Sequence, residues 1–209
     1  MAGVRLISLK LWFASLWMPK NRILKELRRV YFETNNALDS LLKKNGFENT
    51  LDSVDFDMDN IGIEELRRKM ANEHNIKVLS LVSILGRKKA VFQARKELLK
   101  VGIRLGKMAR YELGVGNSIS DMLRAAKIMY RILGIDFEIK PITSNEVLMF
   151  VNRCSLSKVY YDVTCEVLSA ADEGVVRGLN SNFEMSFVQR ITSGAEKCKA
   201  QIKIRRTSD

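Results

Sequence analysis

Residues 147–205 read VLMFVNRCSLSKVYYDVTCEVLSAADEGVVRGLNSNFEMSFVQRITSGAEKCKAQIKIR, and this stretch decides the fold. Its last part alternates strictly: Cys198, Ala200, Ile202 and Ile204 share one face, and lysines, a glutamine and an arginine share the other. A period of two is typical of a half-buried strand. Residues 183–192 give a second alternating strand, and the small polar residues 193–196 between the two predict a turn.

A second pair of strands precedes this hairpin. Residues 135–142 alternate between apolar and charged side chains, which predicts a strand with one buried face. Residues 147–153 are apolar on both faces, which favours a more central strand. Thr143, Ser144 and Asn145 lie between the two runs and have the short polar side chains of a turn. We therefore expect a hairpin on each side of residues 155–178.

Residues 155–178 are predicted to form one helix with Ser155 as its N-cap. An apolar stripe on this helix is expected to pack on the sheet; it comprises Leu156, Val159, Tyr160, Val163, Val167, Ala170, Ala171 and Gly174. Tyr161, Cys165 and Asp172 lie roughly opposite, on a surface that faces solvent, a pocket or a partner. The prediction is an α+β fold, in which an antiparallel four-stranded β-β-α-β-β sheet is covered by a helical layer.

The preceding residues predict additional N-terminal helices. Residues 21–44, 61–75 and 87–113 have helical periodicity, and a further helix should run from Ser118 or Ser120 to Leu133. Residues 76–85 could be a strand or part of a buried helix, because periodicity does not distinguish the two. We expect residues 1–90 to form a helical region that packs on an α+β domain of residues 91–209. His74, the only histidine, is predicted to lie on the surface at a helix end.

The chain is basic, with a net charge of +11 over 209 residues. Such a charge attracts polyanions, so an acidic protein partner is one expectation and a solvated basic face is the other. The sequence contains no zinc-finger spacing and no aromatic-basic ribonucleoprotein pattern, so it gives no support for specific nucleic-acid binding. Residues 4–18 are apolar and predict a helix that packs on the protein or makes peripheral contact with a membrane. An odd number of cysteines, three, indicates a reducing cytoplasm rather than a disulfide framework.

A family resemblance appears in the spacing of residues in the last quarter. The pattern comprises Cys154, Cys165, Asp172, Gly178-Leu-Asn180, Arg190 and Gly194-x-x-x-Cys198. It resembles the C-terminal half of the L-2-amino-thiazoline-4-carboxylic acid hydrolase family, and it is similar to the 4-vinyl reductase domain and to subunits of the TRAPP vesicle-tethering complex. The resemblance implies an α+β sandwich. It also implies that the Gly102-x-x-x-Gly106 helix packs beside the sheet, at a dimer interface.

Three interpretations of the cysteines stay open. They could be core residues, because cysteine is among the most buried residue types. Cys154, Cys165 and Cys198 could instead form a thiol or metal site, with zinc as the metal. They could also line a ligand pocket, in which Tyr161, Cys165, Asp172 and Arg190 supply polar groups and Arg190 holds a carboxylate.

Three functions follow from these interpretations and from the resemblance. The preferred one is a cytoplasmic, homodimeric protein that binds a small organic molecule as a sensor or carrier. The first alternative is a ring-opening hydrolase in which the resemblance makes Cys165 and Asp172 the catalytic residues. The second is a TRAPP-like dimeric scaffold, which should have a large apolar face and no formed pocket.

Overall fold

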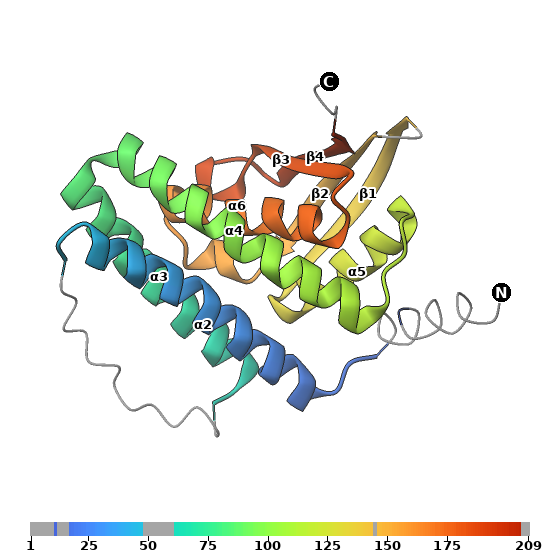
Figure 1. Ribbon diagram of the computed structural model, residues 1–209, viewed down its shortest axis with the longest axis horizontal. Helices are drawn as coiled ribbons and strands as arrows, with labels where there is room; N and C mark the ends of the chain where they lie inside the picture. The colour runs from blue at the N-terminus through green and yellow to red at the C-terminus, as the bar shows by residue number, and fades with distance from the viewer. Residues whose placement is uncertain (1–10, 12–16, 48–60, 144–145, 206–209) are drawn as a thin grey trace.

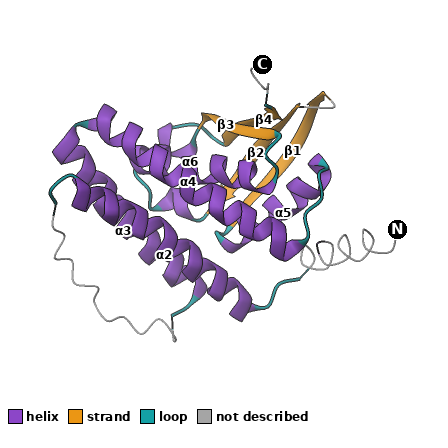
Figure 2. Ribbon diagram, viewed as in Figure 1, coloured by secondary structure: helices purple, strands orange, loops and turns teal. Residues whose placement is uncertain are grey.

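The computed structural model describes residue 11 and residues 17–47, 61–143 and 146–205. These residues form five long helices and a four-stranded sheet (Figures 1 and 2). The helices are α2 (Lys20–Lys44), α3 (Ile63–Leu85), α4 (Arg87–Leu113), α5 (Ile119–Ile132) and α6 (Asp162–Leu179). The strands are β1 (Ile135–Thr143), β2 (Glu146–Cys154), β3 (Phe183–Gln189) and β4 (Cys198–Ile204).

The sheet is antiparallel throughout, with the strand order β1-β2-β4-β3. The predicted α+β class and the β-β-α-β-β order are confirmed. Met149, Val151, Ala200 and Ile202 point from the central strands into the main core, as the alternation of β4 predicts. The third strand ends at Gln189 rather than Thr192, because residues Ile191–Ser193 form a 3₁₀ turn.

Helix α6 lies between α4 and the sheet and contacts both (Figure 1). The stripe predicted to pack on the sheet packs instead on the neighbouring helices: Val163, Val167 and Ala170 share a core cluster with residues of α2, α3 and α4. The opposite side of α6 therefore faces the sheet. This arrangement turns the side that carries Cys165 and Asp172 into the protein interior.

Small residues bring α4 and α6 into backbone contact. A methyl group added at Gly102 would collide with the carbonyl oxygen of Ala171, and one added at Gly106 would collide with that of Val175. Gly174 and Gly178 of α6 meet α4 in the same way. The expected close packing of the Gly-x-x-x-Gly helix beside the core is therefore present, but α6 of the same chain occupies that face, where the resemblance implied a dimer interface.

Helix α3 differs from the sequence interpretation at both ends. Residues 63–85 form one continuous helix, so the run 76–85 is helix and not strand. Gly86, with a φ of 73°, separates α3 from α4, and the boundary expected between residues 90 and 91 falls inside α4. The prediction of a surface His74 is wrong: α3 packs on α2, and His74 is 1% exposed between them and the start of α6.

The start of α6 also differs from the prediction. The helix begins at Asp162 and not after Ser155, because tertiary contacts hold the residues between them. The Ser155 backbone N–H and hydroxyl both donate to the Gly134 carbonyl, at 3.1 Å each. The Asn75 side chain accepts from the Tyr161 N–H and donates to the Val159 carbonyl. These bonds satisfy backbone groups that a helix would otherwise pair.

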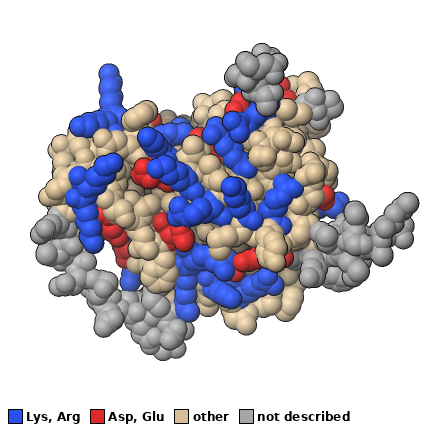
Figure 3. All heavy atoms as spheres, in the orientation of Figure 1, with Lys and Arg blue, Asp and Glu red and all other residues tan. Residues whose placement is uncertain are grey.

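Lysine and arginine side chains are spread over the face shown in Figure 3, with acidic groups among them. Several α4 cations are paired. Arg87 binds Asp162 and Glu166, and Arg95 binds Glu173. This pairing across α4 and α6 reduces the basic surface that the sequence suggests.

Two expectations fall largely outside the described residues. Of the apolar segment 4–18, only Leu11, which is buried, and Trp17 and Met18 are described. The turn residues Ser144 and Asn145 are not described. None of the helices in the described ranges is both long and apolar enough to cross a lipid bilayer.

Candidate functional site: an interior chamber

An interior chamber of about 80 Å³ lies between α6, the sheet and the helices α2, α3 and α5. All three cysteines line it, together with Asp172, Arg190 and Tyr160. The fold thus brings together every residue predicted for the site except one. Tyr161 lies outside: it is the N-cap of α6 and its side chain is 56% exposed, while its neighbour Tyr160 faces the chamber. The backbone is extended just before Asp162, so Tyr160 rather than Tyr161 faces the chamber.

Asp172 projects from the middle of α6 toward the Tyr130 hydroxyl, and it forms no ion pair within the described part of the chain. Burial and, to a smaller extent, the neighbouring Glu173 raise the pKa of its carboxyl from 3.8 to about 7. The nearby Tyr130 hydroxyl and Arg190 act in the opposite direction and lower this pKa. The Tyr130 hydroxyl is buried and has no partner at ordinary hydrogen-bond distance. Asp172 can therefore exchange a proton near neutral pH.

Arg190 follows β3 and extends over the Phe187 ring, with its guanidinium carbon 5.5 Å from the ring centre. One terminal nitrogen donates to the Ser169 hydroxyl at 3.0 Å. Its Nε is buried without a partner, and the guanidinium pairs with no carboxylate among the described residues. An anion that joined this partly buried cation would supply the partner that its Nε lacks.

The three thiols line this chamber and form no disulfide; Cys198 is buried, and Cys154 and Cys165 are partly buried. Burial raises the pKa of Cys165 to about 11, and it raises the pKa values of Cys154 and Cys198 as well. At neutral pH they are protonated thiols, which are weak nucleophiles. The described residues contain no cluster of three or more histidine, cysteine, aspartate or glutamate side chains arranged to hold a metal ion. Zinc binding stays a prediction.

A hydrogen-bonded chain of Thr34, His74 and Tyr160 forms the wall of the chamber on the α2 and α3 side. The Thr34 hydroxyl donates to the Val30 carbonyl at 2.7 Å, so it accepts from His74 Nε2 at 2.9 Å. His74 Nδ1 then accepts from the Tyr160 hydroxyl at 2.7 Å. Burial lowers the pKa of His74 to about 3, which keeps the ring neutral. No local sequence pattern indicates this hydrogen-bonded chain, because Thr34 and His74 are 40 residues apart and His74 and Tyr160 are 86 apart.

We expect Thr34→Val to destabilise the protein by about 1–3 kcal/mol, because the change leaves the His74 Nε2–H buried without an acceptor. Thr164→Val is the matched control: Thr164 is fully buried, and its hydroxyl makes no hydrogen bond with the described residues. Urea unfolding of both variants checks the expectation. Equal stability losses would contradict this hydrogen-bonded chain.

A second cavity of about 100 Å³, the outer chamber, adjoins the inner one. Both chambers are lined by Val30, Thr34, Tyr130, Leu133, Ala171 and Asp172. The outer chamber is mainly apolar, and polar residues lie at one end, where Arg29 pairs with Glu26 at 2.9 Å and with Glu112 at 3.1 Å. Asp172 thus lies where the two chambers meet.

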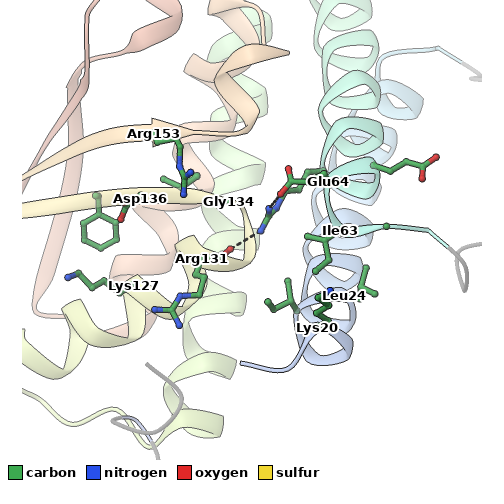
Figure 4. A pocket seen from close by; sticks show the side chains of 15 residues that line it. Lys20, Leu24, Ile63, Glu64, Lys127, Arg131, Gly134, Asp136 and Arg153 are labelled. Carbon is green, nitrogen blue, oxygen red and sulfur yellow. Dashed lines mark hydrogen bonds and ion pairs between the residues drawn. The ribbon is translucent and has the colours of Figure 1, made fainter. Parts of the chain in front are cut away.

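The largest hollow is an open groove of about 960 Å³ on another part of the molecule (Figure 4). Its lining includes Lys127, Arg131 and Arg153, and the guanidinium of Arg67, which donates to the carbonyls of Arg131 and Ile132 at the end of α5. The groove contains none of the cysteines, nor Asp172 or Arg190. Apart from the buried Arg67, its charged residues lie at the surface, so we place the candidate site in the two more enclosed chambers.

Comparison with known proteins supports the fold and leaves the family open. The chain matches no protein-family model and no curated protein sequence. Among solved structures it is similar to trafficking protein particle complex subunit 3 from Naegleria fowleri, covalently bound to palmitic acid. The TM-score is 0.53 and the identity 12%, over 67% of this chain and 95% of that one.

A second similar structure is the phenol-responsive sensory domain of the transcription activator PoxR, solved with phenol. Here the TM-score is 0.51 and the identity 14%, over 66% of this chain and 74% of that one. The chain therefore has a fold found in a trafficking-complex subunit and in a ligand-sensing domain. The resemblance to the amino-thiazoline-carboxylate hydrolases stays a prediction.

Proposed function

We propose that this protein binds a small organic molecule in the inner chamber, as a sensor or carrier. The observation that carries the proposal is a partly enclosed cavity lined by a partly buried arginine without a carboxylate partner and by a protonatable aspartate. Ligand sites are typically concave and mostly apolar, with a few convergent polar groups that fix the orientation of the ligand.

The fold comparison and the thiol chemistry support binding over catalysis. The PoxR domain of similar fold was solved with phenol, and the trafficking subunit carries palmitic acid. In this chain the pKa of Cys165 lies well above neutral pH, which does not favour a thiolate nucleophile. A scaffold was expected to have no formed pocket, so the chamber counts against that alternative. Homodimerisation stays a prediction.

Native mass spectrometry of the purified protein tests the proposal, followed by thermal unfolding with phenol, benzoate and hexanoate. We expect a bound small molecule, or a rise in melting temperature with at least one probe. Cys165→Leu, which fills the chamber, should abolish the effect, and Cys165→Ser, which preserves its size, should retain it. Binding that survives Cys165→Leu unchanged would place the ligand elsewhere. Metal analysis of the same sample, with Cys198→Ala for comparison, tests the zinc prediction.

A hydrolase is the second candidate, and one observation favours it. The pKa of Asp172 is raised to about 7, which is the range in which a carboxyl serves as a general acid or base. In this role Asp172 would activate water against a ligand held by Arg190. Turnover of a cyclic amino-thiazoline acid that is lost in Asp172→Asn, with binding retained, would favour hydrolysis over simple binding.

A further inference from the structure

Both chambers are mainly apolar, and they differ in the charged groups that line them, which specifies a ligand class. The inner chamber contains the Arg190 guanidinium, and the outer chamber is walled mainly by aliphatic side chains, among them Leu105, Ala109, Ile128 and Val175. They meet at Asp172. A molecule that fills both must have an anionic head and an apolar tail.

We propose that the ligand is a linear carboxylic acid of medium chain length, with its carboxylate on Arg190 in the inner chamber and its alkyl chain extending past Asp172 into the outer chamber. This inference rests on the proposed function and names its ligand.

The contacts of Arg190 favour a carboxylate head. One terminal nitrogen is used by Ser169, and the buried Nε has no partner. A carboxylate accepts two parallel hydrogen bonds from the edge of a guanidinium, which matches this free position. The ligand would also neutralise a cation that no carboxylate pairs with in the described part of the chain.

The size of the chambers limits the length of the tail. A cavity of about 150 Å³ holds one benzene molecule. Chambers of about 80 and 100 Å³ together therefore hold a somewhat larger molecule, such as hexanoate, with octanoate as the upper limit. At the far end the paired charges of Arg29, Glu26 and Glu112 close the apolar wall. An alkyl chain long enough to reach these charges should bind no more tightly than a shorter one.

Proton exchange at Asp172 is compatible with this placement. A protonated Asp172 adds no negative charge beside the incoming carboxylate. The titratable groups near it are Tyr130, Tyr160, Glu173, Arg190 and the thiols of Cys154 and Cys198.

Isothermal titration with butyrate, hexanoate, octanoate and decanoate at pH 6.5 tests the proposal. Each added methylene that enters an apolar cavity should strengthen binding about fourfold, up to six or eight carbons, with no gain beyond. Arg190→Met should weaken binding of every acid at least tenfold and leave octanol unaffected. Ala109→Leu, which fills the outer chamber, should remove the gain with chain length and leave butyrate affinity unchanged.

Equal affinity for all chain lengths in the wild-type protein would overturn the proposal, and so would Arg190→Met without effect. If phenol or benzoate still binds in either case, and Cys165→Leu abolishes that binding, the proposed function stands and only the ligand class is wrong. If no probe binds and native mass spectrometry finds no small molecule, the proposed function itself fails. The chain-length series needs no variant, so a poorly folded Ala109→Leu leaves the test intact.

Discussion

Gly102→Ala should destabilise the protein by at least about 2–3 kcal/mol. The added methyl group meets the backbone of α6 at Ala171, and backbone atoms cannot turn aside as a flexible side chain can. Overpacking a core typically costs about 1–3 kcal/mol and occasionally more. Because this overlap is with backbone atoms, we expect a cost above that range, from which the better helix propensity of alanine subtracts about 1 kcal/mol at most. For a chain of this size the melting temperature should fall by about 4–12 °C.

Gly62→Ala is the control for this change, because nothing lies within 4 Å of a methyl group there and its φ of −74° suits any residue. We expect it to change stability by less than about 1 kcal/mol. Gly174→Ala should reproduce the large effect from the α6 side. A Gly102→Ala protein as stable as the control would mean that α4 and α6 do not make backbone contact.

Asp172→Asn should make stability less dependent on pH. Because folding raises the pKa of this carboxyl from 3.8 to about 7, the folded state holds a proton that the unfolded state has released over this range. The wild-type protein therefore loses stability as the pH rises from about 4 to about 7, by up to about 4 kcal/mol at 1.36 kcal/mol per unit. The asparagine variant lacks this loss, so its stability relative to the wild type should improve from pH 4.5 to pH 8.

Urea unfolding of both proteins at pH 4.5, 6 and 8 measures this difference. Glu138→Gln, which removes an exposed carboxylate from β1, is the control. The same pair tests ligand linkage: hexanoate should bind the wild-type protein more tightly at pH 6 than at pH 8, and the variant equally at both. Parallel stability curves for wild type and Asp172→Asn would refute a raised pKa at this position.

The strands were the most predictable part of the fold, and the packing partner of α6 was the least. The alternation of residues 198–204 is a local property, and it fixed both the strand and its buried face. The stripe of Val163, Val167 and Ala170 is equally regular, but periodicity shows only that one face is buried and not what covers it. The glycines at 174 and 178, spaced like those at 102 and 106, were the available sign that α6 packs on α4.

The candidate site was predictable in composition and not in detail. Cys165, Asp172 and Arg190 were singled out from their spacing, and the structure gathers them around one chamber. Tyr161 was placed on the same face by assuming that the helix began six residues earlier. Residues Leu156–Lys158 form a 3₁₀ turn instead, and the backbone is extended at Tyr161, where Asn75 accepts from its N–H. The contribution of His74 depends on contacts between α2, α3 and the residues before α6, which no local pattern contains.

The backbone contact between α4 and α6 makes the two sides of the chambers mechanically unequal. Helix α6 carries Asp172, and it cannot move closer to α4 without atomic overlap. It therefore forms a rigid wall of the chambers. The opposite side is built from side chains of α2 and α5, which can change rotamer or shift by small amounts. We therefore expect the arrival of a ligand to displace α2 rather than α6. Because α2 carries Arg29 and Glu26 at its exposed edge, we expect ligand binding in the chambers to shift these two side chains at the protein surface.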